Sequence, residues 1–273
     1  MDQRKIHYQY SDLVNSLTAV GLKAGDVVFT HVGMGMLGYP DIGNDPSEVA
    51  GLILKAFMKV LGKEGTLLVP TYTYSFCNNE IYNPAKSPSK VGYFTEYFRQ
   101  LPEAERSLDP IFSVAGTGPK IKSVISRLPK DCFGQDCVYD RLIAMNAKIC
   151  NVGVGFRYAT FIHHVEQSVG VPYRYKKIFK GKISAAGKEL SESWLYYVRN
   201  LEDLKSFPDL RNLEKLAKKR NLVKTAPVGR GEISCINCRD LFDLAARQIE
   251  QNPWYLASEA YAGGESIIHS TNQ

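Results

Sequence analysis

The sequence lacks any apolar run of the length that crosses a membrane. Its longest runs fall far short of the roughly 18 residues needed to span a bilayer, and the N-terminus, Met-Asp-Gln-Arg-Lys-Ile-His, has no apolar signal segment. We therefore expect a cytoplasmic protein without a membrane partner. The chain has 273 residues, of which 44% are hydrophobic and 11% aromatic, and this is enough to build a sizeable core.

Cysteine is too sparse for a disulfide framework, since the chain has six cysteines in 273 residues. In a reducing cytoplasm these side chains would stay thiols. Cys235 and Cys238 form one C-x-x-C pair, but no second pair and no histidine pair stand at zinc spacing. Two packed thiols are therefore favoured over a zinc site, and we expect no metal.

Common nucleotide-binding and metalloprotease motifs are also missing. No H-E-x-x-H occurs, and the glycine-rich segment after His31 matches neither G-x-G-x-x-G nor the P-loop pattern. That segment nevertheless places Gly33, Gly35 and Gly38 just past the apolar run 27–30. Glycine lets backbone amides approach a ligand closely, so the pattern predicts a strand followed by a binding loop.

Positive charge exceeds negative charge in only one part of the chain. Between Val171 and Arg230 there are fifteen Lys or Arg against six Asp or Glu, whereas the remainder has 19 against 22. A basic segment can hold anionic ligands, bind nucleic acid or form an ordinary solvated surface. The sequence contains no recognisable nucleic-acid-binding module, so we expect no nucleic-acid partner.

Hydrophobic periodicity predicts alternating helices and strands. Helices are expected over 11–20, after Asp45-Pro46, and over 92–100, with strands over 27–30 and 65–70. This order predicts an α/β fold: a single domain over residues 1–260 with a central, largely parallel sheet flanked by helices, followed by a tail over 261–273. Ligands of such sheets bind beyond the carboxyl ends of the strands.

Residues 149–170 carry the strongest chemical signal. A strand over 148–154 and a break at Gly153 and Gly155 lead into a helix that Thr160 can cap. His163 and Glu166 stand three residues apart on one helix face, one turn after Thr160, and this arrangement suits acid-base chemistry. A solvated ion pair or a satisfied core histidine is the alternative. His164 points about 100° away and is expected to pack.

The segment from Arg106 to Gly118 is rich in small and polar residues. It is a candidate active-site loop, and an ordinary strand flanked by turns explains it equally well.

Several short motifs in order resemble the aminoglycoside 3-N-acetyltransferase family from about residue 10 to residue 256. They are the strand, His31 and glycine loop, Gly65-Thr-Leu-Leu-Val-Pro-Thr71, Gly92 with Phe98-Arg99, Arg106-Ser-x-Asp-Pro-x-x-Ser113-Val-x-x-x-Gly118, Gly153-Val-Gly155 with Thr160-x-x-His163-x-x-Glu166, and Gly229-Arg-Gly-Glu-Ile with Leu241-Phe242 and Asn252-Pro253. Family members usually have His-Pro where this chain has Asp109-Pro110.

The resemblance implies an antibiotic N-acetyltransferase-like domain that binds acetyl-coenzyme A and acetylates an amine. His163 would act as general base, Glu166 would hold its ring, and Thr160 or an amide of the Gly153–Gly155 turn would donate to the oxyanion. The departure at Asp109 favours an amino sugar other than an aminoglycoside.

Ligand contacts are expected at the strand ends. Coenzyme A is assigned to His31, Val32, Gly33, Met34, Gly35, Leu37, Gly38, Thr71, Thr73, Ser113 and Val114, and the acceptor to Tyr72, Arg106, Asp109 and Arg174. A buried strand-end histidine is the alternative for His31.

The basic segment favours an anionic or neutral amino sugar, including a nucleotide-linked one. Its phosphates would meet Lys176, Lys177, Lys180, Lys182 or Arg174. Three alternatives remain: an aminoglycoside 3-N-acetyltransferase, a metal-dependent hydrolase using His31, His163 or His164 with a carboxylate, and a non-catalytic coenzyme A or sugar-binding protein. The oligomeric state is open, a homodimer included.

Overall fold

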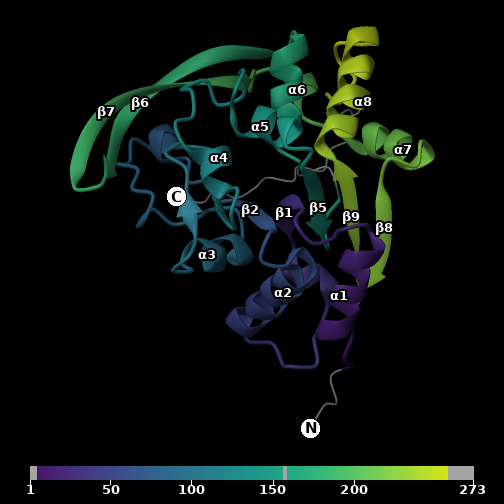
Figure 1. Cartoon of the computed structure of the whole chain (residues 1–273). Helices are drawn as coiled ribbons and strands as arrows, with labels where there is room; N and C mark the ends of the chain where they lie inside the picture. Colours follow the sequence, from purple (N-terminus) through teal and green to yellow (C-terminus); the bar gives the residue numbers. More distant parts are fainter. Residues whose placement is uncertain (1–4, 156–158, 258–273) are drawn as a thin grey trace.

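The computed structural model describes residues 5–155 and 159–257, where one sheet of seven strands is covered by helices on both faces (Figure 1). The strand order is β3-β4-β2-β1-β5-β9-β8. The central strand β1 (Val27–Val32) pairs in parallel with β2 (Thr66–Pro70) and with β5 (Lys148–Val152). The predicted α/β class is confirmed, while the predicted tail over 261–273 lies outside the described residues.

Parallel pairing is confined to these three strands, so the sheet is mixed and not largely parallel. On one side β4 (Val114–Thr117) runs antiparallel to β2 and to β3 (Glu105–Arg106). On the other side β9 (Gly231–Asn237) runs antiparallel to β5 and to β8 (Lys224–Val228). A two-residue turn joins β8 to β9, and so short a link permits only antiparallel pairing.

Helices form a layer on each face of the sheet. The helices α1 (Tyr10–Ala19), α2 (Pro46–Leu61) and α3 (Tyr93–Arg99) cover one face, and α4 (Ile121–Ile125), α5 (Val138–Ala144), α6 (Ile162–Val169), α7 (Arg211–Lys219) and α8 (Cys238–Gln251) contribute to the core on the other. The strands alternate between the two cores, since Phe29 joins the second and Val28 the first. The predicted helices α1, α2 and α3 are confirmed, and Asp45 caps α2 by accepting from the Ser47 and Glu48 amides.

Much of the basic segment forms a long hairpin outside the main sheet. The strands β6 (Arg174–Ala185) and β7 (Lys188–Arg199) pair along their whole length and arc away from the body (Figure 1). Ala186 and Gly187 make the turn with φ of 50° and 74°. Trp194 and Tyr196 are buried, so one face of the hairpin packs on the body.

Short 3-10 helices complete the fold: η1 (Met34–Leu37), η2 (Ser75–Asn78) and η4 (Leu204–Ser206). η1 follows β1, and η2 lies just beyond the end of β2, at the edge where β5 also ends. None of the helices in the described ranges is long and apolar enough to cross a membrane.

Candidate functional site

The carboxyl edge of the three parallel strands gathers most of the predicted residues. His31 on β1 pairs with Asn151 on β5, and Pro70 on β2 pairs with Val114 on β4. Because β4 runs antiparallel to β2, its first residues lie at the same edge as Thr71 and Thr73. The helix α6 follows β5 and carries His163 above this edge.

His163 and Glu166 contact each other directly, as their spacing predicts. His163 Nδ1 lies 2.8 Å from Glu166 Oε2, and the carboxylate is fully buried, whereas the imidazole keeps 19% of its side chain exposed. An ionised carboxylate can only accept a hydrogen bond, so Nδ1 carries the proton and Nε2 presents a lone pair. Among the described residues His163 Nε2 has no hydrogen-bond partner.

Two residues at the start of the hairpin hold the other side of Glu166. The Tyr173 hydroxyl donates to Oε1 over 2.8 Å, and Arg174 Nε lies 2.6 Å from Oε2. The Arg174 contact is an ion pair whose N–H is poorly aligned with the carboxylate oxygen, while its Nη1 donates to the Tyr197 carbonyl. The sequence assigned Arg174 to the acceptor's phosphates, but the structure buries it against Glu166.

The charges around Glu166 shift the pKa of both His163 and Glu166. Burial lowers the pKa of His163, the positive charge of Arg174 lowers it further, and Glu166 opposes both. Burial alone would raise the pKa of Glu166, but the bond from His163 and the charge of Arg174 hold it below its usual value. At neutral pH the site therefore holds a neutral imidazole beside an ionised carboxylate.

His164 has a different environment. Its Nδ1 donates to the Phe133 carbonyl over 2.8 Å, and its ring packs beside Phe242 and Phe161. Burial lowers its pKa. These contacts tie α6 to the core and leave His164 pointing away from Glu166.

Thr160 does not cap α6, so this expectation was wrong. The cap position is Phe161, without a side-chain hydrogen bond, and the Thr160 carbonyl accepts from the His163 amide. The Thr160 side chain lies beside the Tyr72 hydroxyl, where it partly offsets the rise that burial imposes on the Tyr72 pKa. It therefore lies one turn from His163, next to Tyr72.

His31 is a buried histidine at the strand end. Its Nδ1 contacts Asn151 Oδ1 over 3.1 Å, and Asn151 Nδ2 donates to the Gly155 carbonyl. Burial lowers the pKa of His31 to about 4, although the bond to Asn151 opposes the shift. Its Nε2 is buried without a partner among the described residues, so one acceptor remains at the carboxyl edge.

The glycines after His31 serve different purposes. A Cβ on Gly33 would lie 2.6 Å from Val154, and Gly38 adopts φ +81° with His7 2.8 Å from the same position. Packing within the protein explains these two. A Cβ on Gly35 would meet nothing within 4 Å among the described residues, so Gly35 lines open space. Leu37 is buried, whereas Val32 and Met34 are partly exposed.

Arg106 joins the predicted donor and acceptor residues in one hydrogen-bonded cluster. Its Nε donates to Thr71 Oγ1 and Ser113 Oγ, its Nη2 to the Thr71 carbonyl, and its Nη1 to the Pro84 and Ser87 carbonyls. Thr71 and Ser113 are fully buried and also bond to each other. All these contacts are internal, so ligand binding by the three side chains stays a prediction that the geometry does not favour.

Thr73 and Val114 are likewise buried, with Thr73 Oγ1 donating to the Pro110 carbonyl. Val114 begins β4, a short strand flanked by turns within 106–118, which fits the plainer of the two interpretations offered for that segment.

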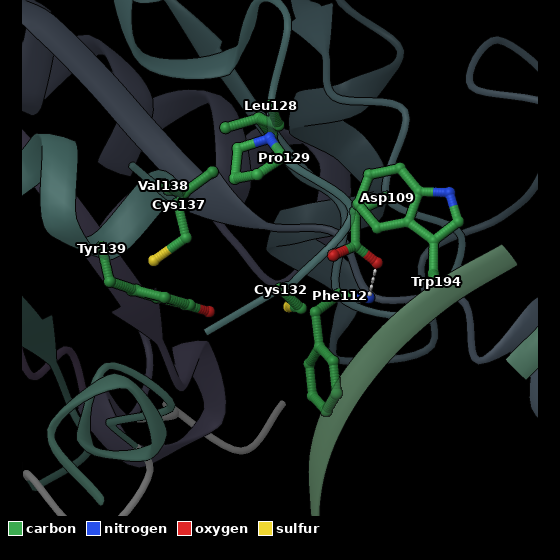
Figure 2. Close-up of a pocket in the computed structure, with 9 residues that line it drawn as sticks. All are labelled: Asp109, Phe112, Leu128, Pro129, Cys132, Cys137, Val138, Tyr139 and Trp194. Atoms are coloured by element: carbon green, nitrogen blue, oxygen red, sulfur yellow. Dashed lines mark hydrogen bonds between the residues drawn. The ribbon is translucent and has the colours of Figure 1, made fainter. Parts of the chain in front are cut away.

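Asp109 lines a small pocket with Phe112, Leu128, Pro129, Cys132, Cys137, Val138, Tyr139 and Trp194 (Figure 2). Its Oδ1 accepts from the Ile111 and Phe112 amides and from the Tyr196 hydroxyl. Burial raises its pKa. Asp109 Oδ1 therefore fixes the loop to β7 through Tyr196, and acceptor binding by Asp109 stays a prediction.

Sequence reasoning missed three neighbours of the pair. Phe133 packs edge-on to the His163 ring at 5.4 Å, Tyr173 binds Glu166, and Asn151 links His31 to the Gly155 loop. Each lies in a different segment from the residue it contacts. The adjacency of Tyr173 and Arg174 at the start of the basic segment is the sole signal in the sequence.

Within the described ranges no group of three or more His, Cys, Asp or Glu side chains is placed to hold a metal ion.

Comparison with known proteins identifies relatives of this chain. A family model described as aminoglycoside 3-N-acetyltransferase matches residues 31–250. Aminoglycoside N(3)-acetyltransferase VII of Streptomyces paromomycinus is 29% identical over 180 residues, 59% of this chain and 60% of that protein. Aminoglycoside N(3)-acetyltransferase IX of Micromonospora chalcea is 30% identical over 176 residues, 57% and 60% of the two chains. The chain thus aligns with 60% of the length of these relatives.

Solved structures share the fold over nearly the whole chain. Aminoglycoside acetyltransferase AAC(3)-IVa has a TM-score of 0.79 at 24% identity, covering 97% of this chain and 96% of its own. YokD from Bacillus subtilis has a TM-score of 0.76 at 18% identity, covering 92% and 97%. A histidine-to-alanine variant of AAC(3)-IVa is described in complex with a gentamicin and with apramycin.

Proposed function

The chain belongs to the aminoglycoside 3-N-acetyltransferase family, and we propose that it transfers the acetyl group of acetyl-coenzyme A to the amine of an amino sugar. The observation that carries the proposal is the buried His163–Glu166 pair, which leaves a partly exposed imidazole nitrogen free. A neutral imidazole with an unshared Nε2 lone pair is suited to take a proton from an attacking amine.

In the proposed reaction, His163 Nε2 accepts the amine proton as the nitrogen attacks the thioester carbonyl. The imidazolium then returns this proton to the sulfur as the C–S bond breaks, and coenzyme A leaves as the thiol. Glu166 holds the Nδ1 proton in place and stabilises the imidazolium, while Tyr173 and Arg174 keep the carboxylate fixed and ionised. Thr160 is the candidate donor to the carbonyl oxygen. The Gly153 amide already donates to the Glu232 carbonyl, which argues against that amide.

We place the coenzyme A arm along the carboxyl edge past β1. Gly35 borders open space, and Val32 and Met34 beside it are partly exposed, so this loop admits a ligand where Thr71 and Ser113 do not. His31 Nε2 is unpaired among the described residues but buried, like Thr71 and Ser113, so contact between His31 and the arm stays a prediction that the geometry does not favour.

An aminoglycoside is the second candidate acceptor, because a solved relative is described with a gentamicin and with apramycin. A polycationic drug needs carboxylates that are free to pair with its ammonium groups. Two carboxylates on the hairpin side, those of Asp109 and Asp131, already have partners within the protein. Asp109 accepts three hydrogen bonds, and Asp131 pairs with Gln167 and Lys176. We therefore favour a less cationic amino sugar.

Two measurements test the proposal. Acetyl-coenzyme A at about 100 times Kd should add about 2.7 kcal/mol to the free energy of unfolding, a rise that a thermal melt detects easily. Thiol release should then identify acceptors in a panel of amino sugars and aminoglycosides, measured at low and physiological salt. No thermal shift at millimolar ligand would reject acetyl transfer. A kcat/KM of about 10⁴ M⁻¹s⁻¹ or more for gentamicin, with other amino sugars inert, would establish the second candidate.

A further inference from the structure

An aromatic surface, partly exposed at three of its four rings, is separated from His163 by the buried ring of Phe133. We call Tyr72, Tyr74, Phe112 and Phe179 the aromatic wall. Phe112 lies 4.9 Å from Tyr72 and 5.8 Å from Tyr74, and it reaches His163 through Phe133 at ring distances of 5.2 and 5.4 Å. The Tyr196 ring contacts the rings of both Phe112 and Phe179. Tyr74, Phe112 and Phe179 each retain exposed surface.

Two lysines flank this wall. Lys177 Nζ lies 4.9 Å from the centre of the Phe179 ring, and in the described part of the chain it forms no ion pair. The Lys90 amide donates to the Tyr72 carbonyl, and its ammonium has one exposed contact with Glu80 at 3.5 Å. Lys177 lies on β6, which packs on η2 where Cys77 lies, and the Glu80 that Lys90 contacts follows η2 closely in the chain. Burial raises the pKa of Cys77, and the charges of both lysines oppose that rise.

The other cations of the hairpin are directed elsewhere. Arg174 is buried against Glu166, and Lys182 pairs with Glu189 at 2.6 Å. Side chains alternate along a strand, so Lys176, Lys180 and Lys182 point to the face opposite Lys177. Lys177 shares its face with Phe179 and with the cross-strand residues Tyr196 and Trp194, which pack on the body.

We propose that the aromatic wall, Lys177 and Lys90 bind the nucleoside diphosphate of a nucleotide-linked amino sugar. The base stacks on the Tyr74 ring and meets Phe112 at its edge, since the two rings are inclined by 75°, and aromatic faces hold bases without sequence-specific contacts. The phosphates lie between the two ammonium groups, and the sugar amine then reaches toward His163. The inference rests on the proposed function for the role of the amine, but nucleotide binding does not require turnover.

The test is calorimetric titration of uridine diphosphate into the protein saturated with coenzyme A. Saturation matters because coenzyme A carries its own nucleotide, which could share a site with the probe. Binding that persists with coenzyme A present, at a Kd below about 1 mM, supports a separate acceptor subsite. Displacement by coenzyme A, or no binding at millimolar nucleotide, overturns the proposal.

Matched variants locate the nucleotide. Tyr74→Ala should weaken binding by about 5- to 150-fold, the range of a lost stacking contact, whereas Tyr74→Phe should change it less than about threefold. Lys177→Glu should weaken binding by about tenfold or more, most strongly at low salt. Lys180→Glu makes the same charge change on the opposite face of the strand and should have little effect. Equal losses for the two lysine variants would overturn the proposal.

The two hypotheses fail in different ways. Uridine diphosphate binding that follows these variants, in a protein that acetylates no amine, leaves the subsite standing and rejects the proposed function. Acetylation of free amino sugars by a protein that binds no uridine diphosphate supports the proposed function and rejects the nucleotide subsite. If both hold, uridine diphosphate glucosamine should have a higher kcat/KM than glucosamine, and Lys177→Glu should remove that advantage.

Discussion

Two charged clusters lie at the same edge of the sheet, and they differ in what they leave free. Around Glu166, donors from His163, Tyr173 and Arg174 converge on one carboxylate, yet His163 Nε2 stays unpaired among the described residues. Around Arg106, every one of the five donor contacts ends on a protein oxygen. The Glu166 cluster leaves His163 Nε2 available to a ligand, whereas the hydrogen bonds of the Arg106 cluster all go to protein atoms.

This difference predicts a catalytic role for the Glu166 cluster and a structural role for the Arg106 cluster. A general base needs an accessible lone pair and a pKa below the working pH, and His163 has both because burial and Arg174 lower its pKa. The Arg106 guanidinium instead binds together three segments of chain, those of Thr71, Ser113 and Pro84–Ser87. We expect substitutions in the first cluster to change rates and substitutions in the second to change stability.

The largest expected effect follows His163→Gln. The variant should lower kcat by about two to four orders of magnitude while leaving the Kd for acetyl-coenzyme A nearly unchanged, since a base acts on the transition state. Steady-state thiol release and the thermal shift measure the two quantities. His164→Gln is the control, and it should cost stability through its bond to the Phe133 carbonyl with little effect on rate. A larger rate loss in the His164 variant would reverse the assignment.

Arg106→Lys should lower the free energy of unfolding by about 2–4 kcal/mol, because a single ammonium cannot reproduce the forked contacts and leaves buried oxygens unpaired. Urea denaturation measures this loss. The kcat of the folded fraction should stay within about threefold. A stable variant with a greatly raised acceptor KM would instead support the predicted contact between Arg106 and the acceptor.

His31 should make stability depend on pH. Its pKa is about 4 in the folded protein and about 6.5 when unfolded, so the unfolded state binds more protons between these values. Stability therefore falls as pH falls from about 6.5 toward 4, by up to about 3 kcal/mol. His31→Gln lacks this titration, so the stability difference between the two proteins should shrink over that window. A constant difference across chemical denaturation from pH 7 to 4 would contradict a buried neutral His31.

Arg174→Gln should produce a smaller rate effect than His163→Gln, about tenfold in kcat, since Glu166 keeps its bonds to His163 and Tyr173. Removal of the positive charge should raise the pKa of His163, because Arg174 lowers that pKa in the unmodified protein. The acid limb of the kcat profile should consequently move to higher pH. Tyr173→Phe removes a bond from Glu166 without removing a charge, so its acid limb should move less. An unshifted profile in the Arg174 variant would show that the ion pair does not tune the base.

Local patterns in the sequence account for much of this molecule. Asp45 caps α2, the apolar run 66–70 is a buried strand, and residues three apart on α6 place His163 against Glu166. These features depend on neighbours within one or two turns of chain, where helix and strand periods fix which side chains share a face. The carboxyl-edge location followed from the strand-helix-strand order for the same reason.

Partners distant in sequence depend on how the whole chain packs. Arg174 could equally have faced a phosphate, and Arg106 binds protein oxygens because the chain brings Thr71, Ser87 and Ser113 around it. The antiparallel flanks of the sheet and the direction of Lys177 likewise depend on strand pairing that no local pattern specifies. Hydrogen bonds and ion pairs between distant segments form only after the core has packed, so residue type shows that a side chain can bind, and the fold decides what it binds.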